Sequence, residues 1–427
     1  MTKGLLSCIS VQARISRVGL LVALLASCAS PQITNTTTTA DLVITYARVY
    51  TAPGKQALDR HTLVIKDGQI SILRATQPND AQIKTKQSID ARAKTLVAGL
   101  WNSHVHFTPP ELGEDPQSVI IEMLLRRGFT HVVDTGSVLE ETLALRSAIR
   151  NGELRGPHIV LANGSFVYTN GTPSYLPGFS LPEVSNPSAA APMVERVLNA
   201  GADGIKIFTG SFQSPIHTIH LPANIVAAIT RAAKARNRFV MAHPTTIEGL
   251  TIAVRGGVDV IAHTTPPEID IPNRILEKMR SQNTALIPTL ALWRYETQKF
   301  GAPIKRAELM ENAALAQLRA LNNAHVEILF GTDVGYKTDF DTTAEYRLMQ
   351  AAGMDWPAIH RSLTTAPAER FGVFTGGADR LSRIEVGAPA NIVLLDGDPA
   401  EDIEALARVA LTVIDGVVVY RALEGVK

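Results

Sequence analysis

The sequence has little of several residue types, and each shortage excludes a class of protein. Only Cys8 and Cys28 are cysteines, so the chain beyond position 28 forms no internal disulfide and offers no thiolate for metal binding or catalysis. Aromatic residues make up 5% of the chain, the formal net charge is +1 and no sustained basic run occurs, which argues against nucleic-acid binding. Any metal site must therefore use nitrogen and oxygen ligands, and a small molecule is the expected partner.

The N-terminus has the layout of a secretory signal peptide. Lys3, Arg14 and Arg17 precede the apolar run GLLVALLAS, which is followed by small residues and is too short to span a bilayer permanently. We expect a signal peptide over residues 1–28. The polar sequence PQITNTTTTA is typical of a linker, so residues 29–40 are expected to form a flexible tether.

The end of this segment suggests where the protein goes. Leu25-Ala26-Ser27-Cys28 resembles the lipobox of bacterial lipoproteins, in which the cysteine is lipidated and becomes the new first residue. Position 29 is alanine, so the aspartate that usually retains such proteins at the inner membrane is missing. The resemblance implies export to the periplasmic side of a bacterial envelope, with membrane contact only through a lipid at Cys28. A plain signal peptide is the alternative.

The mature body combines two sequence patterns. It is 45% hydrophobic and 19% charged, which suits a large globular core. Short alternating strands with turn signals at Asp67-Gly68 and Asp415-Gly416 occur in residues 41–97 and again in residues 380–427. This pattern predicts a small β-sandwich built from both chain ends, with the region between them inserted.

The inserted region, residues 98–379, alternates apolar runs with amphipathic helices. Eight of these runs are read as strands: LWNSHVHF, THVVDTG, HIVLANGS, GIKIF, FVMAH, DVIAH, ALIPTLAL and EILFGTD. Eight strand-helix units predict a (β/α)8 TIM-type barrel in an α/β protein. An open doubly wound sheet is the alternative, although no GxGxxG follows the first strand.

Polar residues late in these strands are the candidate functional groups. His104 and His106 share one strand face because side chains alternate along a strand, and two neutral imidazoles on one face can chelate a cation. Catalytic groups of such barrels come from the C-terminal strand ends, so six residues are expected to converge there: His104, His106, Lys206, His243, His263 and Asp333. By contrast, His131 and His158 open their strands and His61 lies in the sandwich, so these three are interpreted as structural.

The same segments carry a resemblance to a known family. HVH, the lysine of GIKIF, the histidines of VMAHP and VIAHT, and GTD look like the metal-ligand series of the amidohydrolase superfamily, in the branch related to imidazolonepropionase and Xaa-Pro dipeptidases. TTAPAERFGV and ANIVLLDGDPAEDI resemble its last barrel helix and closing strands, so the similarity covers the mature chain. Two positions depart from the pattern: Ala98 replaces a usual proline, and Asn102 replaces a common aspartate before HxH.

The resemblance implies a binuclear metal centre. Lys206 would be carboxylated by CO2 and bridge two divalent ions, most plausibly Zn2+, although Mn, Co and Fe remain open. His104, His106 and Asp333 would hold the first ion, and His243 and His263 the second. The alternative for Lys206 is a snorkelling lysine or one paired with Asp333. The implied reaction is hydrolysis of a C–N bond by a metal-bridging hydroxide, with Asp333 as general base and then general acid.

The substrate is less well defined by the sequence. The expected class is a small amide: a dipeptide, an acylated amino acid or a cyclic amide. Residues in loops after the strands are candidates for contacting it, namely Tyr168, Tyr175, His217, His220 and Arg294. Two alternatives remain: a mononuclear deaminase that uses Glu248 as proton shuttle, and an inactive barrel that binds a ligand. The sequence makes no prediction about oligomeric state.

Overall fold

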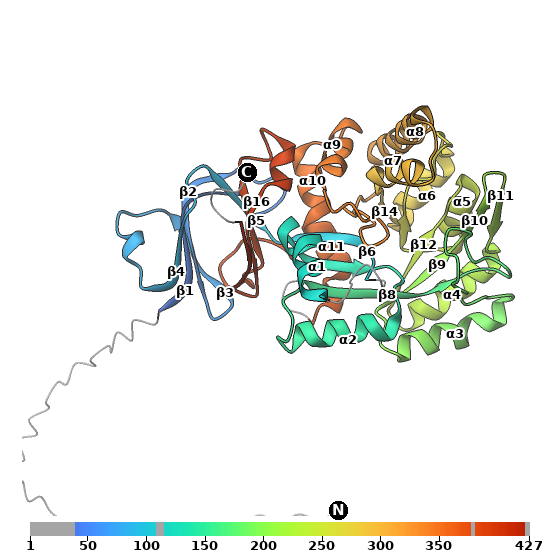
Figure 1. Ribbon diagram of the computed structural model, residues 1–427, viewed down its shortest axis with the longest axis horizontal. Helices are drawn as coiled ribbons and strands as arrows, with labels where there is room; N and C mark the ends of the chain where they lie inside the picture. The colour runs from blue at the N-terminus through green and yellow to red at the C-terminus, as the bar shows by residue number, and fades with distance from the viewer. Residues whose placement is uncertain (1–38, 108–114, 377–380, 423–427) are drawn as a thin grey trace, which may run out of the picture. The chain divides into compact units, whose positions relative to one another are not determined.

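Strands from the two chain ends lie side by side in a computed structural model that describes residues 39–107, 115–376 and 381–422 (Figure 1). They form one eight-stranded sheet in the order β17-β16-β15-β5-β1-β2-β3, with β4 also paired to β1. The strands are β1 (Ala40–Val49), β2 (Leu58–Lys66), β3 (Gln69–Ala75), β4 (Thr85–Asp90), β5 (Lys94–Ala98), β15 (Ile392–Asp396), β16 (Val409–Ile414) and β17 (Val417–Arg421). Both chain ends contribute strands to this sheet, as expected. Hydrogen bonds join all eight strands into one sheet, so the predicted sandwich of two packed sheets stays a prediction.

The predicted turn at Asp67-Gly68 and the predicted hairpin at Asp415-Gly416 are both confirmed, and both are hairpins. β2 and β3 are joined by Asp67-Gly68, and β16 and β17 by Asp415-Gly416. All four turn residues have positive φ, between 48° and 80°. Two-residue hairpin loops favour this left-handed conformation because its twist matches that of the strands, and Asp-Gly tolerates it well.

A second sheet is parallel and makes up most of a barrel. Its order is β14-β13-β12-β9-β8-β7-β6, which follows the chain without the reversal that a doubly wound sheet requires. The strands are β6 (Leu100–Val105), β7 (Phe129–Asp134), β8 (His158–Phe166), β9 (Gly204–Phe208), β12 (Phe239–His243), β13 (Val260–Ala262) and β14 (Ala285–Ile287). The barrel interpretation is therefore preferred over the open sheet.

The expected eighth strand, EILFGTD, is not a regular strand. It makes isolated parallel bridges, Leu286 with Ile328 on one side and Val105 with Val334 on the other. It therefore lies between β14 and β6 and nearly closes the barrel. The extended conformation ends because Asp333 has φ 61°, and Gly331 packs so closely on His104 that a Cβ would lie 2.9 Å from the histidine Cβ. The prediction of eight regular strands is wrong at this segment.

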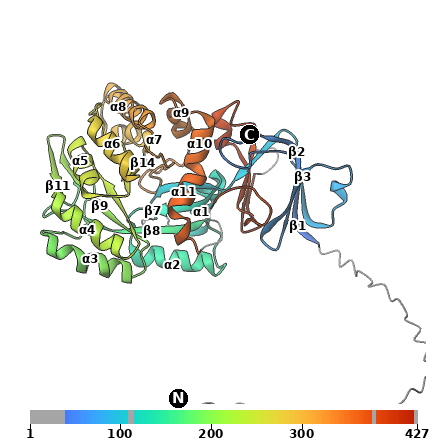
Figure 2. The same cartoon turned by 180° about the vertical axis from the view of Figure 1, so that it is seen from behind.

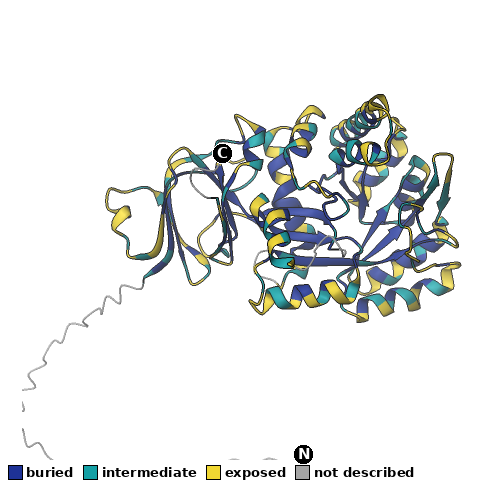
Figure 3. Cartoon of the chain, viewed as in Figure 1, coloured by how far each residue is buried: buried dark blue, intermediate teal, exposed yellow. Residues whose placement is uncertain are grey.

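Helices flank the barrel strands (Figure 2). They are α1 (Pro116–Met123), α2 (Leu139–Arg150), α3 (Pro187–Asn199), α4 (Ala223–Ala235), α5 (Ile247–Gly256), α6 (Asn273–Gln282), α7 (Leu290–Lys299), α8 (Ile304–Asn323), α9 (Thr343–Ala351), α10 (Trp356–Leu363) and α11 (Thr365–Phe371). Short 3-10 segments are η1 (Asp80–Gln82), η2 (Leu125–Arg127), η3 (Gly372–Phe374) and η4 (Ile403–Ala407). The strands are buried, whereas the helices expose their outer faces (Figure 3).

Local sequence explains where several of these helices begin. The side chains of Asn186, Thr246 and Asp355 each accept a hydrogen bond from a first-turn N–H, of Ala189, Gly249 and Ala358 respectively. Such N-caps satisfy backbone donors that have no partner within the helix. A hairpin that the sequence did not reveal, β10 (Gly210–Ser214) with β11 (His217–His220), is inserted between β9 and α4.

The described residues from Thr39 onward belong to one compact unit, so the finer division at residues 97 and 379 stays a prediction. The expected signal peptide, with Cys28, and all but the last two positions of the tether lie outside the described residues. None of the helices in the described ranges combines the length and apolarity needed to cross a bilayer.

Candidate active site

The carboxyl ends of the barrel strands surround one large cavity of about 1280 Å³. It is lined by all six residues that the sequence singled out, His104, His106, Lys206, His243, His263 and Asp333. His104, Lys206 and His243 lie in β6, β9 and β12, and His106 and His263 directly follow β6 and β13. Asp333 ends the irregular eighth segment. The expected convergence is therefore seen in space.

The closest cluster is formed by two histidines and one aspartate. Nε2 of His104 lies 3.2 Å from Oδ1 of Asp333, and Nε2 of His106 lies 3.0 Å from the same oxygen. One ligand atom from each residue can be chosen so that all three lie within 4.8 Å of one another. This spacing and donor set suit a divalent metal ion.

Two further histidines continue this cluster across the cavity. The ring centroids of His104 and His263 are 4.6 Å apart, and those of His263 and His243 are also 4.6 Å apart. Nδ1 of His263 lies 2.7 Å from the hydroxyl oxygen of Thr289. A hydrogen bond there fixes the ring and leaves Nε2 for a ligand, as in many metal sites.

Lys206 is almost fully buried, with 2% of its surface exposed. Burial lowers the pKa of its ammonium group to about 8, although Asp333 and Asp134 oppose the shift. An appreciable fraction of the amine is therefore neutral at mildly alkaline pH. A neutral amine is the form that reacts with CO2, so the environment of Lys206 is compatible with the carbamate that the resemblance implies.

The protonation states of the cluster favour metal binding. Burial lowers the pKa of His104 to about 4 and those of His243 and His263 well below 6.5, so these imidazoles are neutral near pH 7. Burial alone would raise the pKa of Asp333, but His104 and His106 bring it well below its usual value. Neutral imidazoles and an ionised carboxylate are the forms that bind cations.

Unsatisfied buried atoms provide a direct test of whether a metal fits. Within the described residues, both ring nitrogens of His104 and Oδ1 of Asp333 are buried without a hydrogen bond of good geometry. Buried polar atoms normally have partners, because losing their hydration is costly. A cation bound between them would supply the missing partner, so the residues present fit a metal ion.

The backbone around the cluster is held by Asn102. Its Oδ1 accepts hydrogen bonds from the N–H groups of His104 and Thr332, both at 3.2 Å, and its Nδ2 donates to the Thr332 hydroxyl at 2.7 Å. His263 and Asp333 both have left-handed backbone conformations, with φ of 72° and 61°. Such strained positions persist only where the surroundings support them, and they concentrate at functional sites.

Of the predicted substrate residues, Tyr175 lines the cavity and four do not. Tyr168 packs against the main hydrophobic core. His217 is exposed on the β10–β11 hairpin, and His220 lies 2.8 Å from the Thr246 hydroxyl, where α5 begins. Arg294 is held by both carboxylate oxygens of Glu311, at 2.8 and 2.9 Å. The geometry therefore supports only Tyr175 as a residue facing a substrate.

A polar group on α7 was not predicted from the sequence. Trp293, Glu296 and Thr297 line the cavity, and Oε1 of Glu296 accepts a hydrogen bond from the Tyr336 hydroxyl at 3.0 Å. These α7 residues follow the i, i+3, i+4 spacing of one helix face. That spacing, applied from Trp293, would have found Glu296, but the segment was read partly as a strand.

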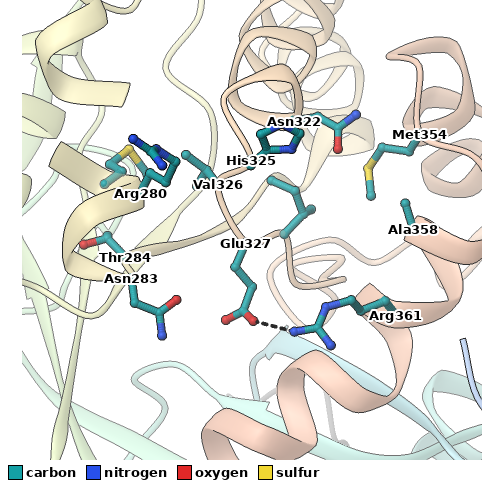
Figure 4. A pocket seen from close by; sticks show the side chains of 12 residues that line it. Arg280, Asn283, Thr284, Asn322, His325, Val326, Glu327, Met354, Ala358 and Arg361 are labelled. Atoms are coloured by element: carbon teal, nitrogen blue, oxygen red, sulfur yellow. Dashed lines mark hydrogen bonds and ion pairs between the residues drawn. The ribbon is translucent and has the colours of Figure 1, made fainter. Parts of the chain in front are cut away.

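A second, smaller pocket of about 360 Å³ lies beyond the amino end of β14 (Figure 4). Its charged side chains include Arg361, whose Nη2 contacts Glu327 at 3.1 Å and Glu369 at 3.0 Å. Because these charges satisfy one another, and because the amino ends of barrel strands serve stability, this pocket lacks the features of an active site.

Comparisons with known proteins agree with this geometry. Residues 95–419 match the sequence model of the amidohydrolase family, so the chain belongs to this family. Among solved structures, 89% of the chain is similar to the whole of a Xaa-Pro dipeptidase with methionine bound in its active site, at 25% identity and a TM-score of 0.76. The same share is similar to the whole of a prolidase complexed with N-methylphosphonate-L-proline, at 25% identity and a TM-score of 0.72.

A more distant neighbour shares the fold alone. It is a molinate hydrolase, at 20% identity and a TM-score of 0.71. The similarity covers 89% of this chain and 95% of the hydrolase. No curated protein sequence matches the chain. The fold, the family and the His-His-Asp cluster together indicate a hydrolase of amidohydrolase type with a candidate metal site.

Proposed function

We propose that this protein is a metal-dependent amidohydrolase that cleaves a C–N bond in a small, peptide-like amide. One observation carries the proposal: four histidines, a lysine and an aspartate line one cavity, and neither buried ring nitrogen of His104 has a hydrogen bond of good geometry within the described residues. The solved neighbours that bind methionine and a phosphonate analogue of proline support a peptide-like substrate.

We infer that the site holds two divalent ions and that these are Zn2+. His104, His106 and Asp333 would hold one ion, and His243 and His263 the other, with a CO2-derived carbamate on Lys206 between them. Nitrogen and oxygen donors of this kind suit zinc, and no cysteine is available as an alternative ligand. When bound, such ions polarise a substrate carbonyl and make water acidic near neutral pH.

Asp333 is the residue that moves the proton. Its ionised carboxylate accepts a proton from the attacking water as the new C–O bond forms, and then delivers that proton to the leaving nitrogen as the C–N bond breaks. His104 and His106 hold the carboxylate between them at 3.2 and 3.0 Å. The proton taken from water thus leaves with the amine product.

A mononuclear deaminase is less well supported. Its proposed proton shuttle, Glu248, does not line the cavity, and its side chain is 72% exposed, 3.9 Å from His220. An inactive ligand-binding barrel is distinguished by the experiment below, because it needs neither bound metal nor turnover.

Export is part of the proposal. We infer from the lipobox that the mature protein begins at a lipidated Cys28 on the periplasmic side of the envelope. Mass spectrometry of the purified N-terminus is expected to find diacylglyceryl-cysteine, and Cys28→Ala is expected to abolish that modification. An unmodified N-terminus would refute the anchor.

The catalytic proposal is tested by metal analysis and a hydrolysis screen. Purified protein is expected to contain two equivalents of divalent metal and to hydrolyse some member of a panel of dipeptides, N-acyl amino acids and lactams. His243→Ala is expected to lose metal and activity. His61→Ala is a matched control, because His61 lies on β2 in the eight-stranded sheet, and this variant is expected to retain both metal and activity. Full turnover by the His243 variant would refute the proposal.

A further inference from the structure

A half-buried carboxylate faces the cavity without a cation. Glu296 lies on α7, and its Oε1 accepts the hydrogen bond from Tyr336. No ion pair of Glu296 occurs within the described residues, and its Oε2 has no hydrogen bond there. A partly buried carboxylate with one oxygen free of hydrogen bonds can accept a positively charged group from the cavity that it lines.

The other carboxylates that line the cavity are occupied or exposed. Oε2 of Glu268 accepts a hydrogen bond from the N–H of Ile247, at the beginning of α5, at 2.8 Å. Glu140 is exposed in the first turn of α2. Asp333 is engaged by His104 and His106. Asp333 belongs to the candidate metal cluster, so Glu296 is the acidic residue of this wall outside that cluster that combines partial burial with an oxygen free of hydrogen bonds, within the part of the chain that the structure describes.

Lys299 makes no ion pair with Glu296 within the described residues. Its ammonium lies over the aromatic rings of Tyr336 and Tyr295, at 4.3 and 5.6 Å from their centroids. Burial and the charge of Asp333 raise the pKa of Glu296 to about 7, whereas the Tyr336 hydrogen bond and the charge of Lys299 lower it. A bound ammonium would favour the ionised carboxylate.

Glu296 is also placed close to the reacting groups. Tyr336 follows Asp333 by three residues in a tight turn, in which the N–H of Lys337 donates to the carbonyl of Asp333 at 2.9 Å. A single hydrogen bond therefore joins Glu296 to the turn that carries Asp333. In an aminoacyl compound the α-nitrogen is only two bonds from the scissile carbonyl carbon, so the two groups must be recognised by neighbouring parts of a site.

We propose that Glu296 binds the α-ammonium group of an unblocked aminoacyl substrate. This inference rests on the proposed hydrolase function and narrows its substrate class to free-amino dipeptides or aminoacyl amides, in preference to N-acyl amino acids. The rings of Tyr175 and Tyr336, with centroids 6.0 Å apart, flank the space beside Glu296.

The experiment compares matched pairs of compounds that differ only at the α-nitrogen. Turnover is measured on Leu-Pro and Leu-Leu and on their N-acetyl forms, and binding of L-leucine and N-acetyl-L-leucine is measured by calorimetry. The metal-loaded wild type is expected to prefer the free amine by roughly 10- to 100-fold in KM and in Kd, as expected for a charged hydrogen bond.

In Glu296→Gln, KM and Kd for the free-amine compounds are expected to differ from those for the acetylated compounds by less than about 3-fold. The kcat on the acetylated compounds is expected to stay near the wild-type value. Glu140→Gln removes a negative charge from the same cavity and is expected to keep the full preference. The proposal is overturned if Glu296→Gln leaves the preference intact, or if it slows both members of a pair equally, which would indicate a positioning role.

The calorimetric comparison separates this proposal from the hydrolase proposal. If no amide is hydrolysed but the free amino acid binds better in a Glu296-dependent manner, only the catalytic function fails. Equal binding of the two leucine compounds, including absence of binding by both, overturns the role of Glu296 whether or not amides are hydrolysed.

Discussion

The two ends of the barrel use histidine in opposite ways. At the carboxyl end, His104 has two buried nitrogens without a hydrogen bond of good geometry in the described residues, and it faces a cavity. At the amino end, His131 stacks on Trp101 with centroids 4.4 Å apart and on His158 at 4.8 Å. Nε2 of His158 also contacts Asp415 at 3.1 Å. Position along the strand therefore decides whether an imidazole is left available to a ligand or consumed by packing.

The strongest test of this contrast is at the carboxyl end. Asp333→Asn removes the charge and the proton acceptor while keeping the shape of the side chain. We expect kcat/KM to fall by at least about 1,000-fold, because general acid-base catalysis and metal retention are lost together. Steady-state kinetics and elemental analysis check this result, and a variant with more than a tenth of wild-type turnover would contradict the assigned role.

The complementary change at the amino end is His131→Ala. It opens a hole in a fully buried stack, so the free energy of unfolding is expected to fall by about 3 kcal/mol, as for other large buried rings. Thermal and denaturant unfolding measure the loss. Metal content and turnover per folded molecule should stay unchanged, and loss of metal from the folded variant would show that the two ends are not independent.

A third test concerns the residue that supports the metal ligands. Asn102→Ala removes hydrogen bonds to the backbone of His104 and Thr332, and we expect metal affinity to fall by about 10- to 100-fold. Competition with a chelator measures this affinity. Asn102→Asp keeps the accepting oxygen and is the conservative control, expected to retain most of the affinity. Equal losses in both variants would argue against the backbone contacts.

The positions of the candidate ligands were predictable because they depend on few rules. Alternation along β6 placed His104 and His106 together, and the convergence of parallel strand ends placed His243 and His263 beside them. Knowledge of tertiary structure was not needed for these positions. The two Asp-Gly hairpins were predictable for a similar reason, since their turn geometry demands particular residues.

Other features depend on contacts that local sequence does not report. ALIPTLAL contains a strand of only three residues, and α7 begins at Leu290, so Glu296 was not expected on a helix facing the cavity. Arg294 was a candidate for binding a substrate carboxylate, and its actual partner Glu311, 17 positions away on α8, could not be found from local sequence. The irregular eighth segment results from the close approach of Gly331 to His104, which only the folded barrel shows.

His360 provides the subtlest test, because its two ring nitrogens also lack partners within the described residues although it is not a predicted ligand. It is buried on α10, stacked on Trp356 with centroids 4.5 Å apart, and it lines neither of the two pockets described above. Unpaired nitrogens therefore do not make a metal site unless other donors share a cavity with them.

Burial lowers the pKa of His360 to about 3, against an ordinary value of 6.5. Between these values the unfolded chain binds a proton that the folded chain does not, so His360 makes stability fall as pH decreases below about 6.5. His360→Leu removes the imidazole that binds a proton in the unfolded chain, together with its two unpaired nitrogens. We expect this variant to raise the free energy of unfolding by about 1 kcal/mol at pH 7 and by more at pH 5. Unfolding measured at both pH values checks the sign. A variant with unchanged metal content confirms that this imidazole, unlike His104, is isolated from the cavity, whereas loss of metal would mean that unpaired nitrogens mark ligands wherever they occur.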